Sequence, residues 1–138
     1  GVLLDLSHEI DLATYLCGRV LKAYGWCGRL SDLQIDSEDT ADVLASTELG
    51  CQVNLHLNYL YRFPVRRGYL QTLTRTLEYD LIKGHLNDSL SGFRSWSVDQ
   101  DFTYLRQLQA FLGERGQELC TLSEGMDVVR VIQEIKRL

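Results

Sequence analysis

The chain changes its hydrophobic period twice. At the start, apolar residues recur at helical spacing behind Ser7, which we expect to cap a short helix that ends at Gly18. Glu9 and Asp11 fall in the first turn, where acidic side chains favour the positive end of the helix dipole. The predicted apolar face consists of Leu12, Ala13, Leu16 and Cys17. The first element is therefore predicted to be a short helix with an acidic start.

From Val20 onward the pattern is that of extended segments. We predict strands at 20–27, 41–48 and 51–61, the last two joined by a tight turn at Leu49 and Gly50. In 51–61 apolar and polar residues alternate, so one face of the sheet is buried and the other polar, which is typical of antiparallel pairing. The apolar set is Val53, Leu55, Leu57, Tyr59 and Tyr61, and the polar set is Gln52, Asn54, His56 and Asn58. Further extended segments are predicted at 68–75, at 76–84 and within 84–97.

After Trp96 the helical period returns in two segments. The first has Phe102, Leu105, Leu108, Phe111 and Leu112 on one face, and the second has Val128, Val131, Ile132, Ile135 and Leu138. We expect Ser123 to cap the second helix. Helices at both ends of the chain around a run of strands predict one α+β domain over 1–138, with an open, mostly antiparallel sheet and helices packed on one face.

Composition argues against several classes of protein. The chain has 138 residues and a formal net charge of −5, and its only basic cluster is RFPVRR at 62–67, so we expect no nucleic-acid partner. No apolar run approaches the roughly 20 residues that a membrane helix needs. The acidic segment 31–42 is interpreted as a solvated loop leading into a strand.

The four cysteines do not follow a metal-binding pattern. Cys17, Cys27, Cys51 and Cys120 are irregularly spaced, without a CxxC motif, and three of them lie in hydrophobic stretches. We expect reduced, buried thiols rather than a zinc site or a disulfide framework. No histidine or cysteine stands at ligand spacing from any of the three histidines, so no metal is expected.

The most notable polar cluster lies at the start of the chain. Asp5, His8, Glu9 and Asp11 crowd the boundary between the run GVLLDL and the first helix. A helix N-terminus favours a neutral imidazole that can accept a proton, whereas neighbouring carboxylates favour the charged form. His8 is interpreted either as a residue of the first turn, with the acids complementing the dipole, or as a group that exchanges protons.

The polar face of the sheet also has two interpretations. It could face water, or, with Tyr24, Trp26 and Tyr69 on neighbouring strands, it could contact a second subunit. His56 and His85 suit solvated or dimer-facing positions better than catalysis.

The order of segments resembles the C-terminal domain of the Gfo/Idh/MocA family of NAD(P)-dependent sugar and polyol oxidoreductases. GVLLDLSHEIDL resembles the start of that domain, and IDSEDTADVLASTELGCQVNLHLNYLYR resembles its paired central strands. RTLEYDL is similar to the following short strand, and YLRQLQAFL and LSEGMDVVRVIQEI are similar to the two closing helices. The likeness covers nearly all of the chain, and SHEID and EDTAD together are its most specific parts.

The resemblance implies that this domain follows an N-terminal Rossmann domain with a glycine-rich fingerprint and an EKP-like motif with a catalytic lysine. Neither motif occurs here, so we expect a fragment of a longer chain that binds NAD or NADP mainly through the missing domain and is inactive alone. The implied protein is a cytoplasmic dehydrogenase of a sugar, nucleotide sugar or polyol, assembled as a homodimer or higher homo-oligomer through the sheet face.

The family's catalytic region has an aspartate and, four residues later, a histidine at a helix start. His8 matches the histidine, while Asp5 precedes it by only three residues and Leu4 occupies the strict position. The resemblance implies that His8 exchanges the substrate proton, with Asp5 in a catalytic or structural role. Glu9 and Tyr104 are expected substrate contacts, and GVLLDL becomes the strand leading to a cleft.

A different class of function fits the same fold. The chain could be a non-catalytic assembly module whose polar sheet face only joins subunits. A small-molecule binding domain that acts alone is weaker, because no polar groups converge on a recognisable pocket motif.

Overall fold

The structure is a computed structural model that describes residues 1–97, 101–113 and 119–137. The chain divides into two compact units, Gly1–Leu60 with Cys120–Leu138, and Tyr61–Leu119. Each unit combines an antiparallel sheet with α-helix, and no sheet in the described part closes into a barrel. The predicted α+β class with open antiparallel sheets is confirmed, although the strand pairing forms two sheets rather than one. That 1–138 acts as one domain stays a prediction.

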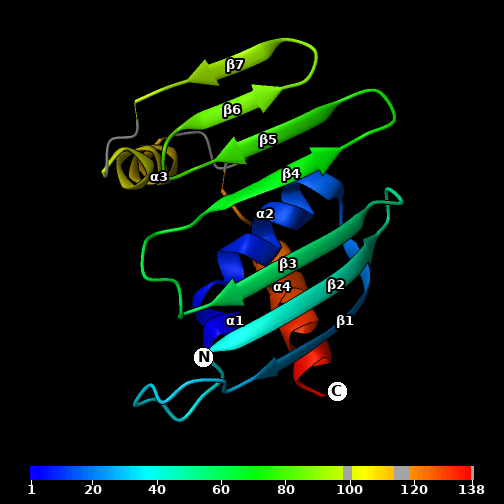
Figure 1. Cartoon of the computed structure of the whole chain (residues 1–138), viewed down its shortest axis with the longest axis vertical. Helices are drawn as coiled ribbons and strands as arrows, with labels where there is room; N and C mark the ends of the chain where they lie inside the picture. Colours follow the sequence, from blue (N-terminus) through cyan, green and yellow to red (C-terminus); the bar gives the residue numbers. More distant parts are fainter. Residues whose placement is uncertain (98–100, 114–118, 138) are drawn as a thin grey trace. The chain divides into compact units, whose positions relative to one another are not determined.

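The first unit is a three-stranded sheet with helices on one face (Figure 1). Its strands, in the order β1-β2-β3, are β1 (Val20–Gly28), β2 (Thr40–Thr47) and β3 (Gln52–Asn58), and its helices are α1 (Val2–Asp5), α2 (Ser7–Cys17) and α4 (Leu122–Lys136). The three predicted strands and the turn at Leu49 and Gly50, where Gly50 has φ +77, are thereby confirmed.

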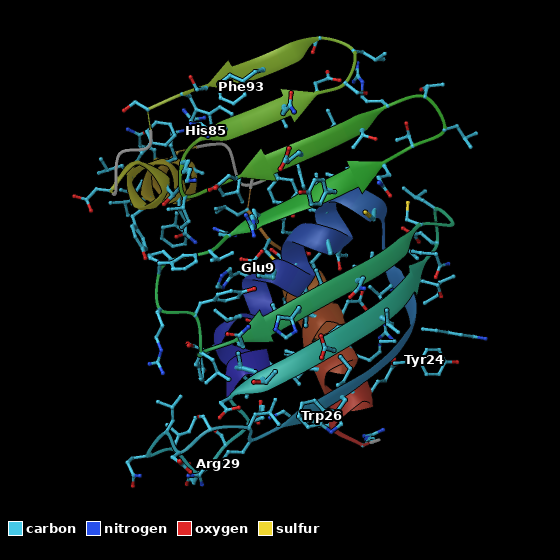
Figure 2. All side chains as sticks on the ribbon, viewed as in Figure 1. Glu9, Tyr24, Trp26, Arg29, His85 and Phe93 are labelled. Atoms are coloured by element: carbon cyan, nitrogen blue, oxygen red, sulfur yellow. The ribbon has the colours of Figure 1, made fainter. Side chains whose placement is uncertain are left out.

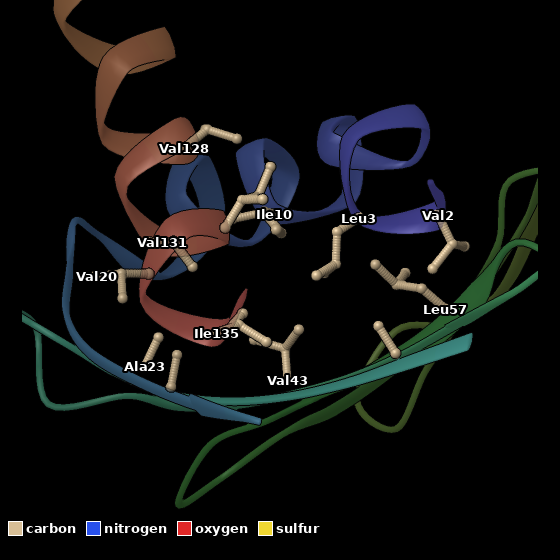
Figure 3. Packing of buried hydrophobic residues seen from close by; sticks show 13 residues of the cluster. Val2, Leu3, Ile10, Val20, Ala23, Val43, Leu57, Val128, Val131 and Ile135 are labelled. Atoms are coloured by element: carbon tan, nitrogen blue, oxygen red, sulfur yellow. The ribbon is translucent and has the colours of Figure 1, made fainter. Parts of the chain in front are cut away.

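The core of this unit lies between the helices and the inner face of the sheet (Figure 3). The alternation predicted for β3 is confirmed up to Tyr59, which packs with Val53, Leu55 and Leu57 against the core, whereas Tyr61 is exposed. The buried cluster comprises Val2, Leu3, Ile10, Val20, Ala23, Ala41, Val43, Ala45, Leu57, Val128, Val131, Ile132 and Ile135.

The start of the chain differs from the prediction. The run GVLLDL is not a strand: Val2–Asp5 form helix α1, and Val2 and Leu3 are fully buried. Ser7 does not cap α2; it is the helix's first residue, and the N-cap is Leu6 without a side-chain hydrogen bond. The buried residue of α2 is Ile10 rather than the predicted set Leu12, Ala13 and Leu16. The strand interpretation failed because a single helical turn buries Val2 and Leu3 of this apolar run just as a strand could, and the run is too short for its period to distinguish the two.

Helix α4 is held by its cap, its apolar stripe and ion pairs. The prediction that Ser123 caps it is wrong, because the N-cap is Thr121, two residues earlier, which forms a reciprocal capping box with Glu124. Arg19 donates two hydrogen bonds of 2.8 Å to Asp127, which ties the start of β1 to the helix. Gly25 in β1 makes the close approach possible, since a Cβ there would collide with the Asp42 carbonyl oxygen and touch Ile135.

The acidic segment 31–42 is only partly a solvated loop. Glu38 pairs with Lys136 of α4 at 2.9 Å. Asp39 is fully buried and accepts hydrogen bonds from the Leu30 and Ser31 amides and from the Ser31 and Thr40 hydroxyls. These donors, the Leu30 amide first, lower the pKa of Asp39 to about 2. A carboxylate that closes a loop in this way cannot be distinguished by sequence from its exposed acidic neighbours.

The described residues of the second unit form an antiparallel meander and a helix. Its strands are β4 (Arg67–Gln71), β5 (Thr76–Asp80), β6 (His85–Asp88) and β7 (Gly92–Ser95), in that order, and its helix is α3 (Phe102–Leu112). The predicted strands and helix are confirmed with shorter bounds. The apolar face predicted for α3 is exposed, however, and Ala110 is its buried residue. None of the described helices has the length and apolar character needed to cross a membrane.

Candidate functional site

The candidate site lies where α1 meets α2. Leu6, with φ −98 and ψ 24, interrupts the helix, although its amide still donates to the Val2 carbonyl at 2.9 Å. Because Val2, Leu3 and Ile10 point into the core, the side chains between them at Asp5 and His8 are left exposed. The local sequence thus positions two polar groups on the outside of a firmly anchored helical junction.

His8 lies in the first turn of α2 beside its neighbour Glu9 (Figure 2 labels Glu9). The His8 Nε2 atom is 3.2 Å from Glu9 Oε1, and the two side chains are 50% and 18% exposed. We infer that Nε2 carries the hydrogen that faces the carboxylate, so that Nδ1 keeps its lone pair. The imidazole is then accessible and has a nitrogen able to accept a proton.

Asp5 is engaged by a residue that the sequence did not suggest. The Tyr59 hydroxyl, just beyond the end of β3, donates a hydrogen bond of 3.1 Å to Asp5 Oδ2. Burial of the phenol, followed by the bond to Asp5 and the charges of Asp5 and Glu38, raises the pKa of Tyr59 to about 12. Tyr59 was correctly expected on the apolar face, but a contact across 54 residues leaves no local signal in the sequence.

The remaining residues predicted for the site lie in other surroundings. Asp11 faces Cys120, whose Sγ is 3.9 Å from Asp11 Oδ1; burial and then Asp11 raise the pKa of that thiol. Leu4 stands four residues before His8, where the family pattern has an aspartate, and is an exposed apolar side chain on α1. Tyr104 lies on α3 in the second unit and is 72% exposed, so its contact with substrate stays a prediction, as does that of Glu9.

A second polar constellation lies on the outer face of the three-stranded sheet. His56 Nδ1 is 2.7 Å from Asp42 Oδ1, and the Asn58 side-chain nitrogen is 2.8 Å from His56 Nε2. The Leu60 amide donates to Asn58 Oδ1, which turns the amide nitrogen of Asn58 toward the histidine. His56 therefore donates through Nδ1 and accepts through Nε2, so both of its nitrogens are engaged in holding the surface in one arrangement.

Apolar side chains flank this constellation. In the strand register Tyr24, Leu44 and Asn54 form one row across the sheet, and Trp26, Asp42 and His56 form the next. Tyr24, Trp26 and Leu44 are 59%, 48% and 55% exposed, and Figure 2 shows the two aromatic side chains along β1. Tyr69, which we grouped with them, belongs to the other sheet.

The described residues do not suit a nicotinamide dinucleotide or a metal ion. All strand pairs are antiparallel, so this part of the chain contains no strand–helix–strand crossover with a phosphate-binding helix start. Gly25 and Gly28 lie within β1 rather than before a helix. No group of three or more histidine, cysteine or acidic residues within the described ranges could hold a metal.

Comparison with known proteins gives a likeness in structure but not in sequence. No family model matches the chain, and no curated protein matches it either. Among solved structures, UDP-N-acetylglucosamine 3-dehydrogenase GnnA from Acidithiobacillus ferrooxidans superposes with a TM-score of 0.79 at 18% identity, over 98% of this chain and 46% of that one.

Two further structures are similar. An oxidoreductase from Agrobacterium radiobacter, in complex with NAD+, L-tartaric acid and magnesium, gives a TM-score of 0.75 at 13% identity, over 95% of this chain and 44% of the other. The WlbA dehydrogenase from Bordetella pertussis, in complex with NADH and UDP-GlcNAcA, gives 0.55 at 17% identity, over 96% and 40%. This chain therefore spans less than half the length of each. This chain therefore shares the fold of one part of each of these oxidoreductase structures, which agrees with the fold expected from the resemblance seen in the sequence.

Proposed function

We propose that this chain is the substrate-binding and assembly domain of an NAD(P)-dependent oxidoreductase that acts on a sugar, nucleotide sugar or polyol. The observation that carries the proposal is the agreement of almost the whole chain with less than half of the GnnA dehydrogenase structure. The parent protein then needs a further domain for the cofactor, since the described residues offer no dinucleotide site. NAD+ and NADH in two of the similar structures support a nicotinamide cofactor for the parent.

His8 is the group proposed to exchange the substrate proton. Oxidation of a secondary alcohol removes a proton from the hydroxyl oxygen and a hydride from carbon, and the nicotinamide, when bound by the parent protein, takes the hydride. A base within hydrogen-bond reach of the hydroxyl typically accelerates such a step about a hundredfold to ten-thousandfold. His8 Nδ1 suits this role because Glu9 lies against Nε2 and would stabilise the imidazolium that forms.

Asp5 is proposed to orient the substrate at the junction between α1 and α2. Its Oδ2 accepts from Tyr59, which fixes the carboxylate relative to β3 and leaves Oδ1 for a substrate hydroxyl. Asp5 is the last residue of α1 and His8 lies in the first turn of α2, and both side chains are exposed on either side of the interruption at Leu6. An exposed carboxylate of this kind can accept charge-assisted hydrogen bonds from the hydroxyl groups of a sugar.

The test replaces His8 in the full-length parent protein. His8→Asn should lower kcat at least about a hundredfold, the usual range for loss of a general base, and should leave the cofactor KM nearly unchanged. His85→Asn is the matched control: its ring contacts Phe93 in the second unit, with centroids 5.1 Å apart (both labelled in Figure 2), and kcat should stay near that of the wild type. A His8→Asn enzyme with wild-type kcat would exclude the assignment.

Assembly through the outer sheet face is a second proposed function. Tyr24, Trp26 and Leu44 form exposed apolar rows beside the ordered Asp42–His56 pair, and such aromatic-rich surfaces with a polar surround are typical of subunit interfaces. We propose a second copy of this chain as the partner.

Sedimentation of the protein tests the assembly proposal. Trp26→Glu should shift the dimer toward monomer, because a carboxylate would be buried without a partner. Tyr15→Glu is the control, since Tyr15 lies on α2 and is 85% exposed, away from the sheet. Identical sedimentation of wild type, Trp26→Glu and Tyr15→Glu would exclude this face as the interface.

A further inference from the structure

Two cysteines that are far apart in the sequence meet at one end of the first unit. Cys17 is the last residue of α2, and Cys51 lies between the turn at Gly50 and the first residue of β3. Both are free and half-buried. The sequence suggested only isolated reduced thiols, because 33 residues separate the two positions and neither is part of a known motif.

One hydroxyl group joins the two cysteine backbones. The buried Thr47 at the end of β2 donates through Oγ1 to the Cys17 carbonyl oxygen at 2.6 Å, and the same Oγ1 accepts from the Cys51 amide at 3.2 Å. The Thr47 amide also donates to the Cys51 carbonyl at 3.1 Å. The end of α2 and the hairpin turn are therefore held at a fixed spacing.

The neighbouring residues continue this contact. The Glu48 amide donates to the Arg19 carbonyl at 2.9 Å, and the Arg19 amide donates to Glu48 Oε1 at 3.1 Å. Gly18 has φ +84, and a Cβ at this position would lie 2.7 Å from the Leu49 side chain. Segments 17–19 and 47–51 consequently run in direct contact on both sides of the cysteine pair.

The thiols themselves also interact. Burial raises the pKa of the Cys17 thiol, and the nearby Cys51 thiol raises it further. The other two cysteines lie in different surroundings. Cys27 is in β1, where its thiol experiences the charges of Glu38 and Lys136, and Cys120 lies against Asp11. Among the described residues, Cys17 and Cys51 are the two cysteines whose backbones bond to one shared hydroxyl group, that of Thr47.

We propose that Cys17 and Cys51 are an oxidation site at which a hydroperoxide converts the two thiols to an intramolecular disulfide. One thiol loses its proton, and the thiolate attacks the peroxide, so that an S–O bond forms as the O–O bond breaks. The departing hydroxide takes up that proton and is released as water, and the cysteine becomes a sulfenic acid. The second thiol attacks the sulfenic sulfur, the S–S bond forms as the S–O bond breaks, and a second water is released. Two thiols thereby lose two electrons and two protons, and hydrogen peroxide is reduced to two molecules of water.

The disulfide would fasten the C-terminal end of α2, the helix that carries His8, to the β2–β3 hairpin. Reduction by a dithiol would reverse the reaction by thiol–disulfide exchange. A cross-link between segments already held by Thr47 requires little backbone movement, which is the condition that decides whether two cysteines can pair. This inference is independent of the proposed dehydrogenase activity.

Peptide mapping of the wild-type protein tests the proposal, because trypsin places the four cysteines in four different peptides. The protein is treated with hydrogen peroxide, remaining thiols are alkylated with N-ethylmaleimide, and the digest is analysed by mass spectrometry with and without dithiothreitol. We expect the peptide ending at Arg19 linked to the peptide spanning 30–62, at a yield independent of protein concentration and lost on reduction.

Matched variants separate this pair from general thiol oxidation. Cys17→Ser should abolish the linked peptide and leave Cys51 open to dimedone, whereas Cys120→Ser should keep the linked peptide. The urea midpoint of the oxidised wild type should rise above that of the reduced protein, because a cross-link restricts the unfolded chain. Full alkylation of Cys17 and Cys51 after peroxide treatment, or links mainly to Cys27, Cys120 or a second molecule, would overturn the proposal.

Discussion

Leu3 and Leu4 provide a direct test of how the start of the chain is folded. Both are leucines on α1, one after the other, yet Leu3 is fully buried against the core and Leu4 is 55% exposed. Leu3→Ala removes three carbons from a packed site. At about 0.8 kcal/mol for each buried methylene the transfer loss is about 2.4 kcal/mol, and the cavity left behind raises the total to about 3 kcal/mol.

Leu4→Ala is the matched control. More than half of its side chain remains in water in the folded state, so the expected loss of unfolding free energy is below about 1 kcal/mol, partly offset by the higher helix propensity of alanine. Urea unfolding followed by far-ultraviolet circular dichroism measures both. With a urea dependence of about 1.5 kcal/mol/M, Leu3→Ala should lower the midpoint by about 2 M and Leu4→Ala by less than about 0.7 M.

The comparison also separates the helix from looser arrangements of GVLLDL. If residues 2–5 were a frayed segment, neither substitution would matter, and the two midpoints would agree with that of the wild type. Equal losses in the two variants would likewise contradict the burial pattern of α1. Only an asymmetric result, with Leu3→Ala far less stable, supports the anchoring of the junction that carries Asp5 and His8.

Other predictions follow from caps and carboxylates. Thr121→Ala should reduce the unfolding free energy by about 1 kcal/mol through loss of the capping box, whereas Ser123→Ala should change it by less than about 0.5 kcal/mol; a larger effect at Ser123 would contradict the cap. The Asp39 carboxylate stabilises the fold above its unfolded pKa near 3.8, and this contribution disappears as the pH falls toward about 2, so Asp39→Asn should be less stable at neutral pH and lose less stability across that window in acid titrations. Tyr59→Phe should remove phenolate absorbance from the part of an alkaline titration near pH 12 and not from the part near pH 10, where loss of signal would argue against the bond to Asp5.

The sequence predicted the elements with strong periods. The alternation in 51–61, the turn at Gly50 and the spacing of Val128, Val131, Ile132 and Ile135 all correspond to observed structure. These patterns are readable because a sheet face or a helix stripe repeats the same burial at a fixed interval. The α+β class followed from their order along the chain.

The errors have local physical causes. GVLLDL is too short and too apolar to show a period, so its helix became evident only when Val2 and Leu3 were seen in the core. Ser7 and Ser123 satisfy the composition of a cap, but Leu6 and Thr121 hold the positions where the backbone enters the helix. The propensities of the residues indicate that a helix starts nearby, but the packing of the chain determines which residue occupies the N-cap.

The candidate site was predicted only in part. His8 and Asp5 could be named because the family resemblance depends on the SHEID stretch around them. By contrast, Tyr59 bonds to Asp5 and Thr47 bonds to Cys17, partners that lie 54 and 30 positions away in the sequence. The residues next to Tyr59 and Thr47 in the sequence give no sign of these partners. Contacts of this kind depend on strand register and helix placement, which the sequence pattern does not determine.

The most direct test of the proposed function is hydride transfer by the full-length parent protein. Nucleotide sugars, beginning with UDP-N-acetylhexosamines, are supplied with NAD or NADP, and formation of the reduced nicotinamide is followed by its absorbance. The account predicts turnover of at least one such substrate by the wild type and its near-complete loss in His8→Asn. Absence of turnover with nucleotide sugars, sugars and polyols, in a parent protein that still associates through the face containing Trp26, would contradict the enzyme and favour the assembly module.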